Sequence, residues 1–536
     1  MDLIGTNRSL PRPVRRERAG ERVRLNFEWR PSNPSTLSPT LSPTLSLRTG
    51  RGSLVGAAFS LFVGLLAFST ITHADALDAV RSQIKSAQPG AVIEIPSGSW
   101  SDAQVVFDST GSQEHPITLR AAEPGKAVFT GTSRIEINGK HLVVDGVLFS
   151  GKTEARQPPI EFGPDSADCR LTNSAVVDFA AENDRRFQYV RVGGSGHRVD
   201  HCLFTGKTNR APVIAAEHGQ HVTIDHNHFR DIPHFTENGH EIVQIVGIGS
   251  NDEPLEAGGA YWLVEENLFE RAHGEGSEIV SIKSNHNVIR HNTIRATKGA
   301  LTMRSGGGNT FDGNLIFGDG MNGAAGLRIS GRNAKATNNY ITGVSGTAMR
   351  LHAGEYIAKD ISGSYEPLAR RGAPLGRVAH YLQMIDAVVS NNLAVDCTGT
   401  DLDYGGGYGA AWPKQQRILL PDNLTFANNV FVSRATKREG PMVKLVSPDE
   451  KAAKLPEDAK PRPIAARGNF FFGAETGREA SDFFAARVED PKLIDAGNGM
   501  TIPSPDSAAV ASGFDPAPFS KLRPLAAADV GPSWVR

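Results

Sequence analysis

A short frame recurs along the chain: an apolar residue, two further residues, an asparagine or small residue, and a second apolar residue. The intervals between successive fourth positions are 25, 40, 25, 22, 25, 53, 37 and 40 residues. A basic period of 22–25 residues, lengthened by insertions in some repeats, predicts an all-β fold, a right-handed parallel β-helix (solenoid) whose turns stack asparagine side chains into ladders. The fourth positions are Cys202, Asn227, Asn267, Asn292, Asn314, Asn339, Asn392, Asn429 and Asn469.

Apolar and polar residues alternate around Lys283 and Arg304, in the stretches EIVSIK and ALTMR. Such alternation predicts half-buried strands whose polar side chains point outward. The two cations are 21 residues apart, one coil of a solenoid, so we expect them to stack on neighbouring strands about 4.8 Å apart. Arg328 and Arg350 continue the pattern at intervals of 24 and 22 residues, which predicts an outward row of four cations.

The first 74 residues have the composition of a leader. Residues 1–50 are rich in Arg, Pro, Ser and Thr and lack apolar periodicity, which predicts a disordered leader or a translation start assigned too early. Residues 51–74 combine a basic start, an uncharged apolar run and small residues, as a signal peptide does. We therefore expect export to the periplasm or the medium, with no stable membrane span after processing. A membrane anchor is the alternative, because the run is just long enough to span a bilayer.

The rest of the chain divides into a predicted β-helix catalytic domain, residues 75–475, and a C-terminal extension, residues 476–536, which we expect to pack on the solenoid. Residues 75–87 have one apolar stripe at helical spacing, which predicts an N-terminal helix that caps the open end of the stack. The insertions 247–260, 353–380 and 398–422 are predicted to be long loops that form a substrate groove. Within the last of them, the aromatic residues Tyr404, Tyr408 and Trp412 are expected either to stack on sugar rings or to hold a flexible loop by packing.

The composition excludes some classes of protein. Three cysteines without metal-site spacing indicate neither a disulfide scaffold nor a zinc module, so we expect them to be buried small residues. The net charge of −1 does not exclude a polyanionic partner, because a local row of cations can lie on a neutral protein. We expect an anionic polysaccharide as partner and no nucleic acid, and the oligomeric state is not predicted.

A row of cations at strand spacing suits a linear polymer of carboxylates, since each arginine can hold a carboxylate by two hydrogen bonds. In a uronate polymer the C5 proton becomes acidic once the neighbouring carboxylate is neutralised, and the oxygen at C4 can leave. Lys283 is the candidate base and Arg304 the residue that stabilises the developing charge. The candidate substrate-binding residues are Arg328, Arg350, His352 and Gln244.

The segments SEIVSIKSNHNVIRHNTIRATKGALTMRSG, GLRISGRNAKATNNYITG and DVGPSW together resemble polysaccharide lyase family six, which holds alginate lyases and chondroitinase B. The resemblance implies a β-elimination with Lys283 as base and Arg304 as acid. It also implies calcium, held by Asn238, Glu275 and Glu278. Here the two acids read E-x-x-E, a spacing that would point them to opposite faces of a regular strand unless a bulge intervenes.

Alginate is the expected substrate, with dermatan sulfate or chondroitin as the alternative. Two other classes stay open. A glycoside hydrolase needs closely spaced carboxylates, for which Asp312 and Asp319 are the candidates. A non-catalytic β-helix could use the row of cations to bind a polysaccharide without turnover.

Overall fold

The computed structural model describes residues 73–535, apart from 182–184, 251–252, 359–364, 368–380, 413–414 and 449–459. All of these described residues belong to one compact unit, Thr70–Arg536. The predicted leader and all but the last two residues of the predicted signal peptide lie outside them. In the part of the chain that is described, no helix combines the length and the apolar character that crossing a bilayer requires.

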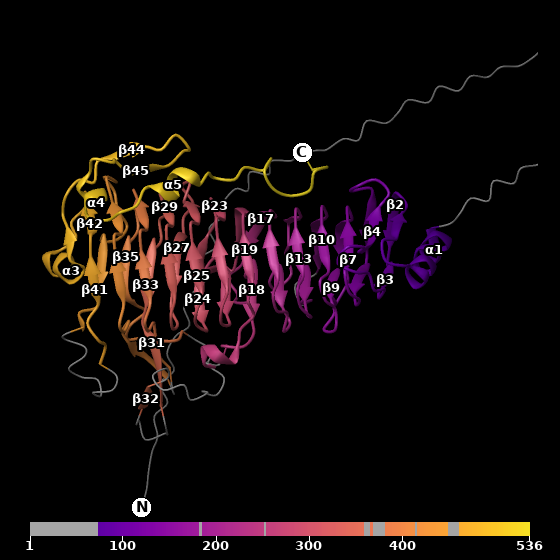
Figure 1. The fold of residues 1–536 in the computed structure, drawn as a ribbon, viewed down its shortest axis with the longest axis horizontal. Coiled ribbons are helices and arrows are strands. Elements are labelled where there is room, and N and C mark those ends of the chain that lie inside the picture. Colours follow the sequence, from indigo (N-terminus) through magenta and orange to yellow (C-terminus); the bar gives the residue numbers. More distant parts are fainter. Residues whose placement is uncertain are drawn as a thin grey trace, which may run out of the picture. The chain divides into compact units, whose positions relative to one another are not determined.

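Three long parallel sheets form the body, and each coil adds one strand to each sheet. The first runs from β1 (Val92–Ile95) to β41 (Ala465–Arg467), and the second from β2 (Gly98–Ser101) to β43 (Ala486–Arg487). Neighbouring strands of a sheet are three apart in the chain from β1 to β30 (Met349–His352), and five apart where strands of the insertions intervene. The chain therefore winds as a parallel β-helix, and this prediction is confirmed (Figure 1). The third sheet contains β3 (Gln104–Phe107), β6 (Arg134–Ile137), β9 (Ile160–Phe162), β12 (Val190–Val192), β15 (Ile214–Ala216), β18 (Val243–Val246), β21 (Glu278–Lys283), β24 (Gly299–Ser305), β27 (Ala324–Ile329), β30 (Met349–His352), β35 (Leu402–Gly406) and β40 (Val443–Leu445).

The predicted asparagine ladder is present. The ladder has eight asparagines, from Asn227 to Asn469, and each of the first seven donates from Nδ2 to the Oδ1 of the asparagine one coil later, at 2.9–3.2 Å. None is more than 1% exposed. A second, shorter ladder links Asn287 to Asn309 at 3.0 Å. Buried amides that satisfy one another in this way fix the vertical register of the coils.

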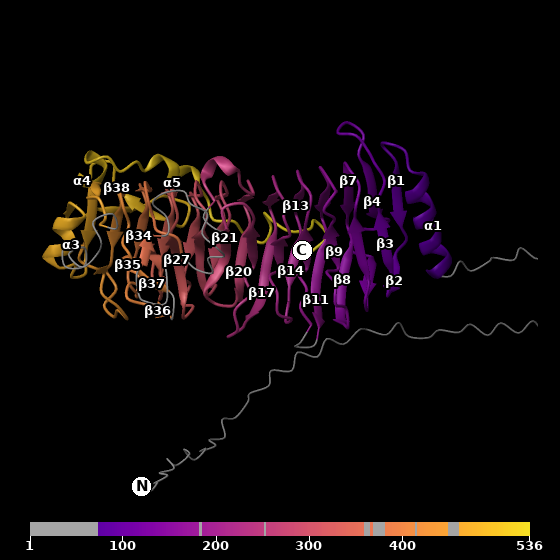
Figure 2. The ribbon, with the colours of Figure 1, turned by 90° about the horizontal axis from the view of Figure 1, so that it is seen from below.

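The two ends of the stack are covered differently. The helix α1 (His73–Ser86) buries Val80 and Ile84 against the first coil, and α3 (Arg478–Phe483) lies at the opposite end (Figures 1 and 2). The C-terminal segment then runs back along the outside of the coils. Asp515 donates its backbone N–H to Asn391 at 2.7 Å, and Trp534 donates from Nε1 to the Asn173 carbonyl at 2.8 Å.

Two insertions predicted to be loops contribute strands instead. β31 (Gly354–Ala358), β32 (Tyr365–Pro367), β36 (Ala411–Trp412) and β37 (Gln415–Leu419) form a small antiparallel sheet in the order β32-β31-β37-β36. Tyr404 lies on β35, is 1% exposed and packs on Phe484 at a ring distance of 5.9 Å, so it belongs to the core. The three cysteines are buried and free, as expected.

The stability of the solenoid is expected to depend on pH through His197, which is 1% exposed. Its Nδ1 accepts the Cys169 backbone N–H at 3.1 Å, and its Nε2 lies 3.1 Å from Ser166 Oγ. Burial lowers the pKa of His197 to about 4, because the charged imidazolium would lose its hydration in the core. The stabilisation is complete above the unfolded pKa near 6.5 and is lost as the pH falls through 4, by up to about 3 kcal/mol.

Urea unfolding of the wild type and of His197→Gln between pH 7 and 4 measures this contribution. The variant should be less stable at pH 7 and lose less stability on acidification. If the free energy of unfolding depends on pH in the same way for both proteins, His197 is not the source of the pH dependence.

Candidate functional site

The row of cations lies on the third sheet, but its register differs from the prediction. Ile282 pairs with Met303, whereas Lys283 pairs with Ser305, so a one-residue bulge inserts Arg304 between these pairs. In a bulge two residues on one strand oppose one on its neighbour, and side-chain directions change locally. The predicted direct stacking of Lys283 on Arg304 is therefore wrong.

The remaining arginines are partly in register. Arg328 lies opposite Thr302 of β24 and opposite Arg350 of β30. Arg304 therefore stands two residues further along its strand than the position facing Arg328. Only Arg328 and Arg350 stack directly, so the four cations do not form the continuous ladder that their spacing predicts.

The charged ends of these side chains nevertheless converge on carboxylates. Lys283 Nζ lies 3.0 Å from Glu241 Oε1. Arg304 and Arg328 each place Nη1 3.5 Å from Glu278 Oε1. The neighbouring coil brings Arg350 Nε to within 2.8 Å of Asp403 Oδ2. Each cation of the predicted row thus has an acidic partner.

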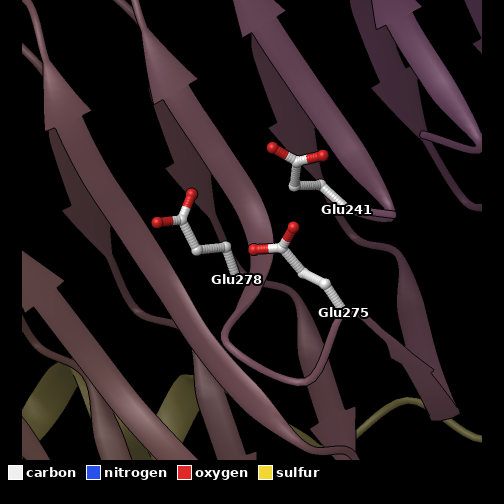
Figure 3. Close-up of side chains that lie close together, drawn as sticks. All are labelled: Glu241, Glu275 and Glu278. Carbon is white, nitrogen blue, oxygen red and sulfur yellow. The ribbon is translucent and has the colours of Figure 1, made fainter. Parts of the chain in front are cut away.

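Three glutamates form a cluster at the centre of this surface. One carboxylate oxygen from each of Glu241, Glu275 and Glu278 lies within 4.8 Å of the other two (Figure 3). Glu275 comes from the turn before β21 rather than from a regular strand, and this turn brings the E-x-x-E pair together. The predicted ligand Asn238 has an exposed side chain, and Glu241 stands in the cluster instead.

The electrostatics of the cluster suit a cation. Burial and the neighbouring Glu241 raise the pKa of Glu275. Burial alone would raise the pKa of Glu278 too, but Arg304, the Ser281 hydroxyl and Arg328 lower it below its usual range. Glu241 is 1% exposed, and within the described structure its Oε2 has no hydrogen-bond partner. Crowded carboxylate oxygens with unused acceptor capacity are the ligands that a hard divalent cation such as Ca²⁺ requires, so the residues fit such an ion.

Tyr381 joins the arginines to this cluster. Its hydroxyl donates to Glu278 Oε1 at 2.9 Å and accepts from Arg328 Nη1 at 2.6 Å. The Arg304 and Arg328 guanidinium carbons lie 5.6 and 5.8 Å from the centre of its ring. Burial and Glu278 raise the pKa of Tyr381 to about 12, so the phenol stays protonated. Arg304 stays charged, because Glu278 raises its pKa despite the opposing effect of burial.

The two remaining candidates occupy different environments. Gln244 lies on β18 and donates from Nε2 to Glu241 Oε1 at 2.7 Å, so it belongs to the glutamate cluster. His352 is 3% exposed and stacks on Tyr381 at a ring distance of 3.9 Å. Its expected place in an open groove is wrong, because the Tyr381 ring covers it. Burial lowers the pKa of His352 well below its usual range.

A shallow trough of about 250 Å³ runs beside the glutamate cluster across four coils. Its charged lining residues are Arg328 and Arg350. The other lining residues have small or aliphatic side chains, so they form the bottom of the trough and the guanidinium groups project above it. They are Gly276, Ser277, Gly299, Ala300, Gly323, Ala325, Leu327, Gly346 and Thr347.

The two acids that the sequence offered as candidates for a hydrolase, Asp312 and Asp319, lie elsewhere. Asp312 ends β25 (Thr310–Asp312) on the first sheet and accepts the Asn338 amide at 2.8 Å. Asp319 follows β26 (Leu315–Phe317) on the second sheet and is ion-paired with Arg295 at 2.8 Å. Both have structural partners, and neither lies on the sheet that carries the cations.

Comparisons with known proteins identify the family and support the fold. The chondroitinase B family model matches residues 75–454. A PL6 family polysaccharide lyase from Pseudopedobacter saltans is 33% identical, with a TM-score of 0.69 over 86% of this chain and 98% of its own. The PL6 family alginate lyase AlyGC is 26% identical, with a TM-score of 0.69 over 86% of this chain and 58% of its own.

A mannuronic acid specific family 6 lyase from human gut microbiota, 24% identical, has the same fold, with a TM-score of 0.64 over 85% of this chain and 94% of its own. No curated protein sequence matches the chain.

Proposed function

The chain belongs to the chondroitinase B family and is a PL6 polysaccharide lyase, and from this premise we propose that it cleaves alginate by β-elimination. The observation that carries the proposal is the convergence of Lys283, Arg304 and Arg328 on one cluster of carboxylates beside the trough. A uronate bound there would place its carboxylate among these charges and its C5 proton towards Lys283.

Lys283 acts as the base in this mechanism. It removes the C5 proton, the electron pair forms the C4–C5 double bond, and the C4–O bond breaks. The leaving oxygen takes up a proton from water or from the Lys283 ammonium. Arg304 stabilises the charge that develops on the uronate carboxylate rather than giving up a proton, because its guanidinium stays charged.

We propose Ca²⁺ as the ion of the glutamate cluster, held by Glu241, Glu275 and Glu278. Three carboxylates face three cationic side chains there, so the formal charges of these side chains cancel without a bound ion. A bound divalent ion would leave a positive excess that attracts the substrate carboxylate and makes the C5 proton more acidic. The protein residues hold and orient the uronate around that charge.

Two observations favour alginate as the substrate. The alginate lyase AlyGC is among the similar structures, and the low floor of the trough suits sugar rings without bulky substituents. Dermatan sulfate is the second candidate, since the matching family model is that of chondroitinase B. An extracellular polymer as substrate accords with export to the periplasm or the medium, which the apolar run before residue 74 also favours.

Incubation with polymannuronate, polyguluronate and dermatan sulfate tests the proposal. We expect the ultraviolet absorbance of the new conjugated double bond to rise with an alginate polymer. With dermatan sulfate, we expect the absorbance to rise more slowly or not at all. Reducing ends without that absorbance would indicate a hydrolase. Binding without either product would indicate a non-catalytic solenoid.

Tyr381 is expected to act as a positioning residue. Tyr381→Phe keeps the ring against Arg304 and Arg328 but loses both hydroxyl contacts, and should lower kcat/KM about tenfold. Tyr381→Leu also removes the ring and should lower kcat/KM about a hundredfold. Steady-state kinetics on alginate check the order of the two variants. Equal losses would show that the ring itself does not position the arginines.

A further inference from the structure

The two oxygens of Glu241 have different environments. Oε1 accepts hydrogen bonds from Lys283 Nζ at 3.0 Å and from Gln244 Nε2 at 2.7 Å. Oε2 has no hydrogen-bond partner among the described residues, although the side chain is only 1% exposed. A buried carboxylate oxygen without a partner carries a free-energy cost unless something else satisfies it.

The other two carboxylates of the cluster are better satisfied. Glu275 accepts from the Gly239 backbone N–H at 2.8 Å and from the Ser277 hydroxyl at 2.5 Å. Glu278 accepts from the hydroxyls of Ser281 and Tyr381. Glu241 is therefore the member of the cluster with acceptor capacity to spare, and its carboxylate faces the other two (Figure 3).

We propose that the carboxylate of Glu241 is shared between the catalytic lysine, Lys283, and the cation. This inference rests on the proposed function. Without the ion, Glu241 holds Lys283 back over the cluster. A divalent ion bound by the three glutamates would attract the carboxylate of Glu241 and so weaken its ion pair with Lys283. The amine of Lys283 would then be free to move towards the trough. Glu241 is thus a positioning residue for Lys283, and filling the cation site prepares the base.

The arrangement predicts competition, because one carboxylate cannot fully neutralise an ammonium group and a divalent ion together. Lys283→Met removes the competitor and should tighten the binding of the ion about tenfold. Glu241→Gln removes a ligand and should weaken binding about 10- to 100-fold. Lys335→Met, at an exposed position of β28 (Lys335–Thr337) on another sheet, is the matched control and should bind as the wild type does.

Calorimetric titration of the full chain with Ca²⁺, repeated with Tb³⁺ luminescence, measures these affinities without any substrate. Thermal unfolding of each variant checks the fold, and Lys283→Gln replaces Lys283→Met if the latter does not fold. Tighter binding without the lysine and weaker binding without Glu241 support the sharing. The proposal is contradicted if removal of Lys283 leaves the affinity for the ion unchanged or lowers it. It is also contradicted if Glu241→Gln binds the ion as tightly as the wild type does.

The outcome does not depend on the substrate. A chain that forms no unsaturated product could still show the competition, and an active lyase could lack it. The failure of this inference is therefore distinguishable from the failure of the proposed function.

Discussion

Replacing Lys283 with methionine is expected to lower kcat on alginate by about a thousandfold, since loss of a general base typically costs 10²–10⁴ in rate. Methionine keeps much of the length and apolar volume of the lysine side chain but cannot accept a proton. The initial rate of increase in ultraviolet absorbance at saturating alginate measures the loss. Because Lys283 is only partly buried on an outer face of the sheet, the solenoid should still fold.

The control for this variant is Lys335→Met, which should keep wild-type activity. Thermal unfolding of Lys283→Met should show one cooperative transition, lowered by the loss of the partner of Glu241. A folded Lys283→Met protein that retains more than about a tenth of the wild-type rate would remove Lys283 from the role of base.

Asn292→Ala is expected to destabilise the solenoid by about 3–5 kcal/mol, because it leaves several buried groups unsatisfied at about 1–3 kcal/mol each. Asn292 accepts the backbone N–H and the side-chain amide of Asn267 at 3.1 and 3.0 Å. It donates to Val264 O at 2.9 Å and to Asn314 Oδ1 at 3.0 Å. Alanine removes these four bonds, together with the one from Nδ2 to the Arg290 carbonyl at 2.9 Å, and leaves a cavity in the core.

Urea unfolding followed by circular dichroism measures this effect. Asn322→Ala, an exposed turn asparagine outside the ladder, is the control and should change the stability by less than about 0.5 kcal/mol. Equal stability of the two variants would show that the ladder does not hold the coils together.

The fold could be predicted from the sequence because its signal is repeated. One asparagine in an apolar frame is weak evidence, but the same frame repeated at intervals of one coil establishes the period of the solenoid. Asn227 and Asn469, although separated by many insertions, belong to one continuous ladder. The antiparallel sheet of β31, β32, β36 and β37 could not be predicted in the same way, because its pairings join two insertions that share no repeat.

The site was only partly predictable. The spacing of Lys283 and Arg304 indicated neighbouring strands correctly, but a bulge of one residue is invisible to a count of residues. Glu241 was missed although a signal exists: HEIVQI at residues 240–245 repeats SEIVSI at residues 277–282, and Val243 pairs with Val280. An alignment of these two coils places Glu241 beside Glu278.

Tyr381 and Asp403 gave no such signal. Tyr381 follows an insertion and reaches Glu278 across 103 residues of sequence. Asp403 meets Arg350 only because β35 returns to the sheet after another insertion. Contacts of this kind depend on where an inserted segment ends, and periodicity does not encode that.

The most direct test of the central claim is digestion of alginate in oxygen-labelled water, followed by mass spectrometry of the products. Elimination breaks the C4–O bond without adding water, so the wild type should release oligosaccharides that carry the double bond and no oxygen label. Products that contain one labelled oxygen and lack the double bond would show hydrolysis instead, and would contradict the account.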